Sequence, residues 1–302
     1  MTRDNNKTNT NSVNQNIRSN QNIISNQNII SNKNITSNKF IFDKAFNKAM
    51  GGGLSGSAAM IIQVSSLMWL RTTMNYQYRY GTPFTKTLQN LYNEGGVKRF
   101  YRGYFAALSL GPLARFGDVA ANVSVTSYFD DNPQMKNKIP TPVQTVFASS
   151  TASIWRVFLM PLDTLKTTLQ VEGPQALGII KNKIRTNNIG VLYHGSAAGL
   201  SATFIGHYPW FLTYNTLNKN IPKYDETYKN FIRNAVIGFS SSFVSDTCSN
   251  SLRVIKTTKQ TYKDSESYMN ITKEIIRKDG YHGLFGRGLK TRILTNGLQG
   301  CM

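Results

Sequence analysis

Uncharged apolar stretches alternate with polar segments along this chain of 302 residues. The first stretch runs from Leu54 to Leu70, and the cleanest runs from Ser196 to Asn218 without any charge. A helix needs about 17 to 20 apolar residues to cross a bilayer. Further stretches begin at Tyr104, Pro142, Phe231 and Gly288. The pattern therefore predicts six helices of the membrane-spanning type.

One of these stretches ends in a segment that combines a proline with opposite charges. Pro161 removes a backbone hydrogen bond inside a helix and is expected to kink its axis. Asp163 and Lys166 follow it and are three residues apart, so they share one helix face. A kinked helix with charges at one end indicates a helix that moves during function.

Two sequence markers recur three times at intervals of about 90 residues. One is a basic residue followed by two threonines, at Arg71, Lys166 and Lys256, which are 95 and 90 residues apart. The other is a turn that ends in a glycine, at Gly103, Gly195 and Gly288, which are 92 and 93 residues apart. The spacing predicts three repeats, each with two apolar helices around a polar loop and a short amphipathic helix.

The segment before the first repeat has low complexity. Residues 1–40 are rich in Asn, and the unit Ser-Asn-Gln-Asn-Ile-Ile starts at Ser19 and again at Ser25. Such a polar tract buries too little apolar surface to offset the entropy of ordering, so we expect a disordered tail. A cleaved presequence is the alternative, although the tail lacks an amphipathic Arg face.

The composition narrows the classes of function. The net charge of +20 suits nucleic acid, an anionic membrane surface or an anionic substrate, but charged residues make up only 17% of the chain. Basic residues lie between apolar stretches, which favours a membrane protein over a basic nucleic-acid-binding module. Cys248, Cys301 and three His form no disulfide framework or metal spacing. We find no catalytic triad or phosphate loop, and expect no enzyme activity, metal or cofactor.

The repeats resemble the mitochondrial carrier family, whose signature is Pro-x-acid-x-x-base on the odd helices, then acid-Gly and aromatic-base-Gly. The acid-Gly motif is present at Glu94-Gly95 and Asp279-Gly280 but not at Asn187-Asn188. The resemblance implies an all-α membrane protein with six transmembrane helices in a pseudo-threefold bundle and short amphipathic matrix helices. It covers residues 41–302, as tandem repeats 41–138, 139–226 and 227–302. The last helix ends early, at Met302, so either the product is truncated or this helix does not span fully.

The resemblance also implies a gate of ion pairs on the odd helices. The second repeat fits the signature, whereas the first has Met68 and the third has Arg253 where an acid is expected. One carboxylate then faces four cations, so we expect a loose, electropositive gate. The gate residues are Arg71, Asp163, Lys166, Gln170, Arg253, Lys256 and Gln260, with the helix kink at Pro161.

Two charges lie deeper in the predicted helices. Arg156 and Asp246 each lie seven residues, about two helical turns, before a gate position. They should therefore stand at one height on related helices. Charges inside membrane helices are costly and usually functional. We expect an Arg156–Asp246 pair across a cavity, with two separately hydrated charges as the alternative.

In the family the substrate is held midway along the even helices. By spacing, this level falls at Leu110 or Gly111, at Ala202 and Thr203, and at Thr295. The candidate substrate-binding residues are Arg115, Asp118, Thr203, His207, Arg292 and Thr295, with Asn296 and Gln299 nearby. Arg residues suit a carboxylate or phosphate. Structural roles are the alternative: mutual pairing of Arg115 with Asp118, a neutral core hydrogen bond for His207, and a helix cap for Arg292.

The resemblance finally implies a function. We expect transport of a small anionic metabolite across the mitochondrial inner membrane by alternating access, in a multi-pass protein. A monomer bound to lipid, including cardiolipin, and without nucleic acid is expected. A carrier relative that does not transport is the alternative.

Overall fold

The computed structural model describes residues 43, 54–131, 141–263 and 266–301, without the side chains of residues 54–60 and of some positions in the second pair of long helices. The predicted tail, residues 1–40, lies outside the described residues. Within the described ranges, every regular element is a helix. The all-α class that the sequence predicted is therefore confirmed for this part of the chain.

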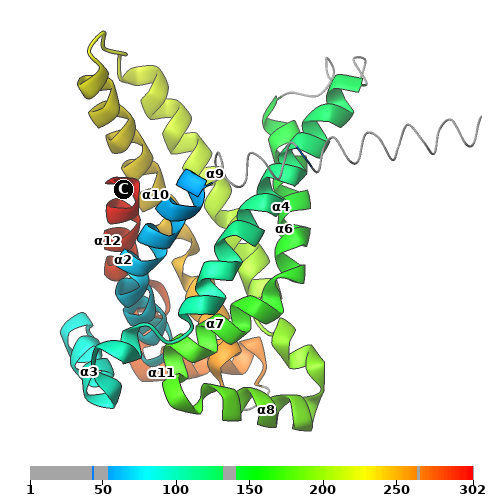
Figure 1. Ribbon diagram of the computed structural model, residues 1–302, viewed down its shortest axis with the longest axis vertical. Helices are drawn as coiled ribbons and strands as arrows, with labels where there is room; N and C mark the ends of the chain where they lie inside the picture. The colour runs from blue at the N-terminus through cyan, green and yellow to red at the C-terminus, as the bar shows by residue number, and fades with distance from the viewer. Residues whose placement is uncertain (1–42, 44–53, 132–140, 264–265, 302) are drawn as a thin grey trace, which may run out of the picture.

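The helices fall into two groups by direction (Figure 1). Helices α3, α8 and α11 lie across the lower end of the molecule, and most of the others run from this end toward the opposite one. The helices are α2 (Leu54–Tyr80), α3 (Phe84–Phe100), α4 (Tyr104–Asp131), α6 (Thr141–Phe158), α7 (Met160–Glu172), α8 (Ala176–Asn187), α9 (Ser196–Asn220), α10 (Thr227–Thr261), α11 (Tyr268–Gly286) and α12 (Leu289–Cys301). Short 3₁₀ helices lie at Gly173–Gln175 and Ile189–Tyr193.

The third long segment is broken where the sequence places its proline. Helix α6 ends at Phe158 and α7 begins at Met160, so Pro161 lies in the first turn of a new helix. A proline costs little there, because the first N–H groups of a helix have no intrahelical acceptor. The kink that the sequence predicted is thus a break, and it lets α7 set its own direction for Asp163 and Lys166.

A left-handed turn interrupts each of the three loop segments. Gly96, Asn188 and Gly280 have φ angles of 60°, 63° and 66°. Asn188 is the one non-glycine residue with positive φ in the described part of the chain. With a ψ of 177°, Asn188 lies in a backbone region that is almost exclusive to glycine, so its backbone is strained. The second repeat keeps this backbone turn, although it lacks the acid-Gly sequence.

Three glycines let the start of one repeat's second helix approach the first helix of another repeat. A Cβ on Gly103 would lie 3.1 Å from the Lys166 carbonyl oxygen in α7, and one on Gly195 would lie 3.1 Å from that of Lys256 in α10. A Cβ on Gly288 would lie 3.2 Å from that of Met74 in α2. The three contacts run from the first repeat to the second, to the third and back to the first.

A second set of contacts follows the same cycle. Arg99 donates to the Gln170 and Val171 carbonyls at 2.7 and 2.6 Å, and Lys183 donates to the Gln260 carbonyl at 3.1 Å. Arg287 donates to the carbonyls of Tyr78 and Arg79. The last carbonyls of a helix have no intrahelical donor, so each cation caps the odd helix of the next repeat.

Acidic residues hold two of these capping cations in place. Glu94 accepts from Arg99 at 2.7 Å, and Asp279 accepts from Arg287 at 2.5 Å. The guanidinium groups are buried and the carboxylates are partly exposed. The acid of the acid-Gly motif thus orients the base that closes the cycle.

In the described part of the chain, no helix is both long enough and sufficiently apolar to span a bilayer.

Replacing Gly288 with Ala should lower stability, whereas replacing Gly238 with Ala should not. Gly288 has a positive φ of 65°, which costs a residue with a side chain about 1 kcal/mol. A Cβ at Gly288 would also lie 2.7 Å from a Tyr78 ring carbon. The control is Gly238→Ala within α10, where φ is not positive and a Cβ would meet nothing within 4 Å. The overpacking adds about 1–3 kcal/mol. Thermal unfolding in mild detergent measures both variants, and equal losses would contradict this account of the junction.

Candidate functional site

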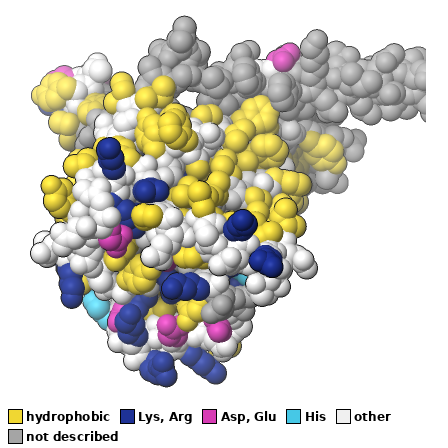
Figure 2. All heavy atoms as spheres, turned by 60° about the horizontal axis from the view of Figure 1, so that its bottom comes forward, with side chains coloured by type: hydrophobic (Ala, Val, Ile, Leu, Met, Phe, Trp, Pro, Cys, Tyr) yellow, Lys and Arg dark blue, Asp and Glu magenta, His cyan; other side chains and the backbone are white. Residues whose placement is uncertain are grey.

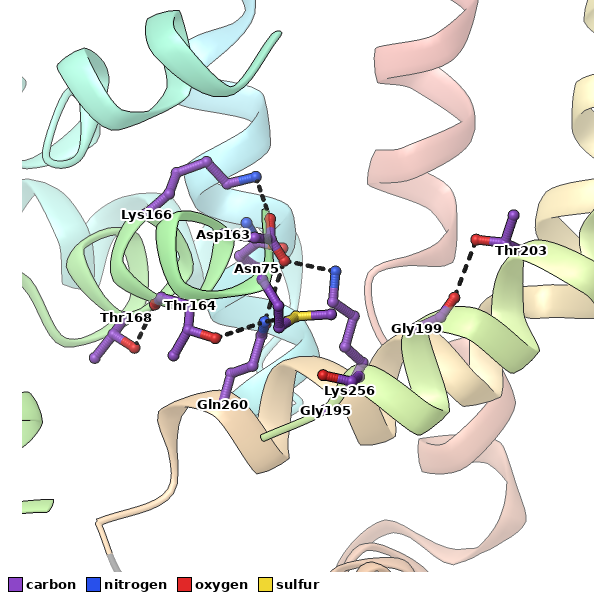
Figure 3. A network of polar contacts seen from close by, with 12 residues as sticks. Asn75, Asp163, Thr164, Lys166, Thr168, Gly195, Gly199, Thr203, Lys256 and Gln260 are labelled. Atoms are coloured by element: carbon purple, nitrogen blue, oxygen red, sulfur yellow. Dashed lines mark hydrogen bonds and ion pairs between the residues drawn. The ribbon is translucent and has the colours of Figure 1, made fainter. Parts of the chain in front are cut away.

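The Asp163 carboxylate lies between two ammonium groups from different helices (Figure 3). Lys166 of α7 lies 2.8 Å from one carboxylate oxygen and Lys256 of α10 lies 2.7 Å from the other. The exposed fractions of the three side chains are 13%, 21% and 26%. A shielded carboxylate gains more from each cation than one in open water does. The group therefore ties α7 to α10 by charge.

Glutamine and asparagine side chains surround these charges. Gln260 donates to Asp163 at 3.1 Å and to the Thr164 hydroxyl at 3.2 Å. Gln170 accepts a 2.6 Å hydrogen bond from Asn75 of α2. Asn75, Gln170 and Gln260 each lie four residues after the basic residue of their repeat. The sequence reasoning missed Asn75, and this i+4 spacing was the signal that would have found it.

The first helices of the three predicted repeats, here called the odd helices, are α2, α7 and α10, and they meet in pairs at three junctions. The Asp163 group lies at the junction of α7 with α10. Among the described residues, the other two junctions, α2 with α7 and α2 with α10, lack an ion pair. Met68, which is fully buried, stands where the first repeat would place an acid, and its sulfur accepts from Gln170 at 3.5 Å. At the third junction Arg253 donates to the Ser249 hydroxyl and Arg71 donates to Gln299. Within the described residues, no carboxylate forms an ion pair with Arg71 or Arg253.

Two adjoining cavities open beside these residues, with volumes of about 500 and 320 Å³. They share Arg71, Leu110 and Ala114. Among the described side chains, their walls hold one carboxylate, that of Asp163. The cations on the walls are Arg71, Arg156, Lys166, Arg253, Lys256 and Arg292. The interior is therefore strongly electropositive and suits an anion.

The structure brings several of the predicted substrate-binding residues to these walls. Thr203 lines the larger cavity, and Arg292 and Thr295 line the smaller one. Leu110 and Gly111, at the same predicted level, also lie on the walls. His207 lies one turn beyond Thr203 on α9, with its ring against Phe211. The side chains of Arg115 and Asp118 lie outside the described residues.

Asp246 has a different partner from the one that the sequence predicted. It accepts from Arg292 of α12 at 2.6 Å and also from Asn296. The predicted partner, Arg156, lines the larger cavity with an exposed side chain, whereas Asp246 is buried against α12. Spacing along the odd helices predicted the height of Asp246 but could not show that α12 supplies a nearer cation.

Comparison with known sequences decides the family. The sequence model described as mitochondrial carrier protein matches residues 138–225 and 227–302, which together make up more than half of the chain. The chain belongs to the mitochondrial carrier family. The resemblance predicted from the repeats is thereby confirmed, and the matched segments overlap the second and third predicted repeats of this carrier.

A curated relative from Candida albicans also matches. It is the mitochondrial thiamine pyrophosphate carrier 1, which is 24% identical over 168 residues. The aligned region covers 51% of this carrier and 56% of the relative, so it spans about half of each protein.

Replacing Asp163 with Asn should destabilise the protein by about 3 kcal/mol, because two shielded ammonium groups lose their counter-charge. The matched control is Glu226→Gln, which removes a carboxylate from an i,i+3 pair with Lys229 whose side chains are 52% and 43% exposed. An exposed pair contributes at most about 1 kcal/mol. Thermal unfolding of both variants in mild detergent measures the difference. Similar melting temperatures for the two variants would show that Asp163 does not hold α7 and α10 together.

Proposed function

We propose that this protein transports a small anionic metabolite across the mitochondrial inner membrane by alternating access. The observation that carries the proposal is the electropositive interior: among the described side chains, six cations and one carboxylate line the adjoining cavities. Family membership supports the transport of a solute. An interior of this charge attracts anions and repels cations.

The proposed arrangement has six helical segments around the cavities: α2, α4, α6 with α7, α9, α10 and α12. Helix α9 has 25 residues, so it is about 38 Å long, and α10 has 35. Their outer faces carry exposed apolar side chains, such as Tyr208 and Leu212 of α9 and Phe231 of α10. Figure 2 shows apolar side chains over much of the upper surface, with Lys and Arg nearer the lower end.

Alternating access requires a contact that holds one end closed and can be broken. The Asp163–Lys256 pair joins α7 to α10 at the lower end of the cavity, close to the caps of the odd helices. An anion that draws Lys256 toward itself weakens this ion pair. Substrate can shift the equilibrium only by the difference in its affinity for the two states. We propose that this competition for cations supplies that difference.

The relative suggests a first substrate to test, a diphosphate ester that carries flat heteroaromatic rings. A guanidinium group can donate two hydrogen bonds to the oxygens of one phosphate, and arginines line the cavity walls. Trp210 and Tyr214 lie seven and eleven residues after Thr203, on the same face of α9. Their rings are stacked, with centroids 5.0 Å apart. They offer an aromatic surface about two to three helical turns along α9 from Thr203, which lies on the cavity wall.

Uptake by proteoliposomes tests the proposed function. The purified full chain should take up labelled thiamine pyrophosphate faster than labelled thiamine, since only the ester carries negative charge for the cations to bind. Liposomes loaded with unlabelled ester should take it up faster than empty ones if the protein exchanges substrates. Uptake no faster than in liposomes without protein, across a panel of phosphates and carboxylates, would refute transport.

Arg292 should be required for uptake. Arg292→Gln removes one cation from the smaller cavity and should lower uptake about tenfold, the loss of one charged hydrogen bond. Lys290→Gln on the same helix removes an exposed charge and should leave uptake unchanged. Because Arg292 pairs with Asp246, the variant with both Arg292→Gln and Asp246→Asn separates lost binding from a buried unpaired carboxylate. Normal uptake by this double variant would remove Arg292 from the binding site.

A carrier relative that does not transport is the second candidate. Met68 and Arg253 favour it, because two of the three junctions between odd helices lack the acid that an ion pair needs. A junction that cannot close would not support alternating access. Uptake without exchange, or none at all from a protein that still binds anions, would favour this candidate.

A further inference from the structure

Arg253 and Arg71 both line the larger cavity at the junction between the third and first repeats, whereas the other two junctions hold an ion pair and a thioether. Arg292 lines the smaller cavity, whose wall also includes Arg71. Three guanidinium groups from α2, α10 and α12 thus share one region. Like charges in a shielded place repel one another, so they weaken the contact between α2 and α10, which also includes a hydrogen bond from Thr258 to the Tyr78 carbonyl.

The carboxylates nearby are already engaged. Asp246 bonds with Arg292 and Asn296, and Asp163 bonds with Lys166 and Lys256. Arg71 and Arg253 donate to neutral oxygens of Gln299 and Ser249, which do not cancel their charge. Each guanidinium has five N–H donors, and each of these two contacts uses one of them.

We propose that this junction is an anion-binding site, in which a tetrahedral oxyanion bridges Arg71 and Arg253 and takes the place of the missing carboxylate. The guanidinium fork matches two oxygens of a phosphate, so one anion can accept from both arginines at once. The bound anion cancels their repulsion and strengthens the contact between α2 and α10. Closure at this junction then depends on an anion, whereas the Asp163–Lys256 junction closes with its own charges.

The anion has two possible sources, free inorganic phosphate or the phosphate group of a substrate. The second source rests on the proposed function, and the first does not. Both give the same chemistry at the junction, so the test must separate them.

Thermal unfolding of the purified full chain in mild detergent, at constant ionic strength with gluconate as the balancing anion, provides the test. Saturating inorganic phosphate should raise the melting temperature of the wild type by about 5 °C. If only thiamine pyrophosphate gives this shift, the substrate supplies the anion. No shift with either compound would overturn the site.

Two substitutions that restore an acid give a matched comparison. Arg253→Asp supplies the carboxylate that would pair with Arg71, so it should raise the melting temperature without ligand and abolish the shift. Met68→Asp supplies the acid of the first junction, near Lys166, and should keep the shift. A full shift in Arg253→Asp, or its loss in Met68→Asp as well, would show that the anion binds elsewhere.

A milder variant guards against misfolding of Arg253→Asp. Arg253→Gln removes the charge but keeps a long polar side chain, and it should weaken apparent phosphate affinity about tenfold. Unchanged affinity would refute the proposal. The test is independent of transport: phosphate stabilisation that depends on Arg253 supports the site even if proteoliposomes take up nothing. Uptake by a wild type that neither compound stabilises would leave transport standing without this site.

Discussion

The carboxylate of Asp163 is the charge on which the lower end of the cavity depends. It is the one acid that the odd helices contribute to the cavity walls among the described residues, and it serves two lysines from two helices. A carboxylate shared by two cations is stabilised by attraction to both, while the free-energy cost of its own desolvation arises only once. Gln260 and Thr164 add hydrogen bonds that orient it. The position of α7 against α10 follows from this group.

The three junctions between odd helices solve the same packing problem with different chemistry. One joins Asp163 to Lys256, one buries the thioether of Met68 against Gln170, and one brings Arg71 and Arg253 to the same cavity. The backbone contacts around them are nevertheless similar, because Gly103, Gly195 and Gly288 each approach a carbonyl of the next repeat. Repeated backbone geometry thus tolerates divergent side chains.

Much of this could be predicted from the sequence because repetition is a strong signal. Two markers, the base-Thr-Thr triplet found at Lys166 and the turn glycine found at Gly195, each recur three times in the sequence. This repetition predicted the helical repeats and the family. The partner of Asp246 could not be predicted, because α12 approaches α10 in three dimensions and no spacing rule records that approach. The turn at Asn188 was missed for another reason: its left-handed backbone is visible only as φ, and the expected glycine is absent.

The cycle of contacts also bears on how the chain folds. Gly288 packs on Met74 and Arg287 caps the end of α2, although more than 200 residues separate the partners. Contacts so distant in sequence carry a large loop-closure entropy and are slow to form. The C-terminal end of α2 emerges early from the ribosome and must wait for the third repeat to receive its cap. A single repeat expressed by itself would therefore lack the contacts that other repeats make with the end of its first helix.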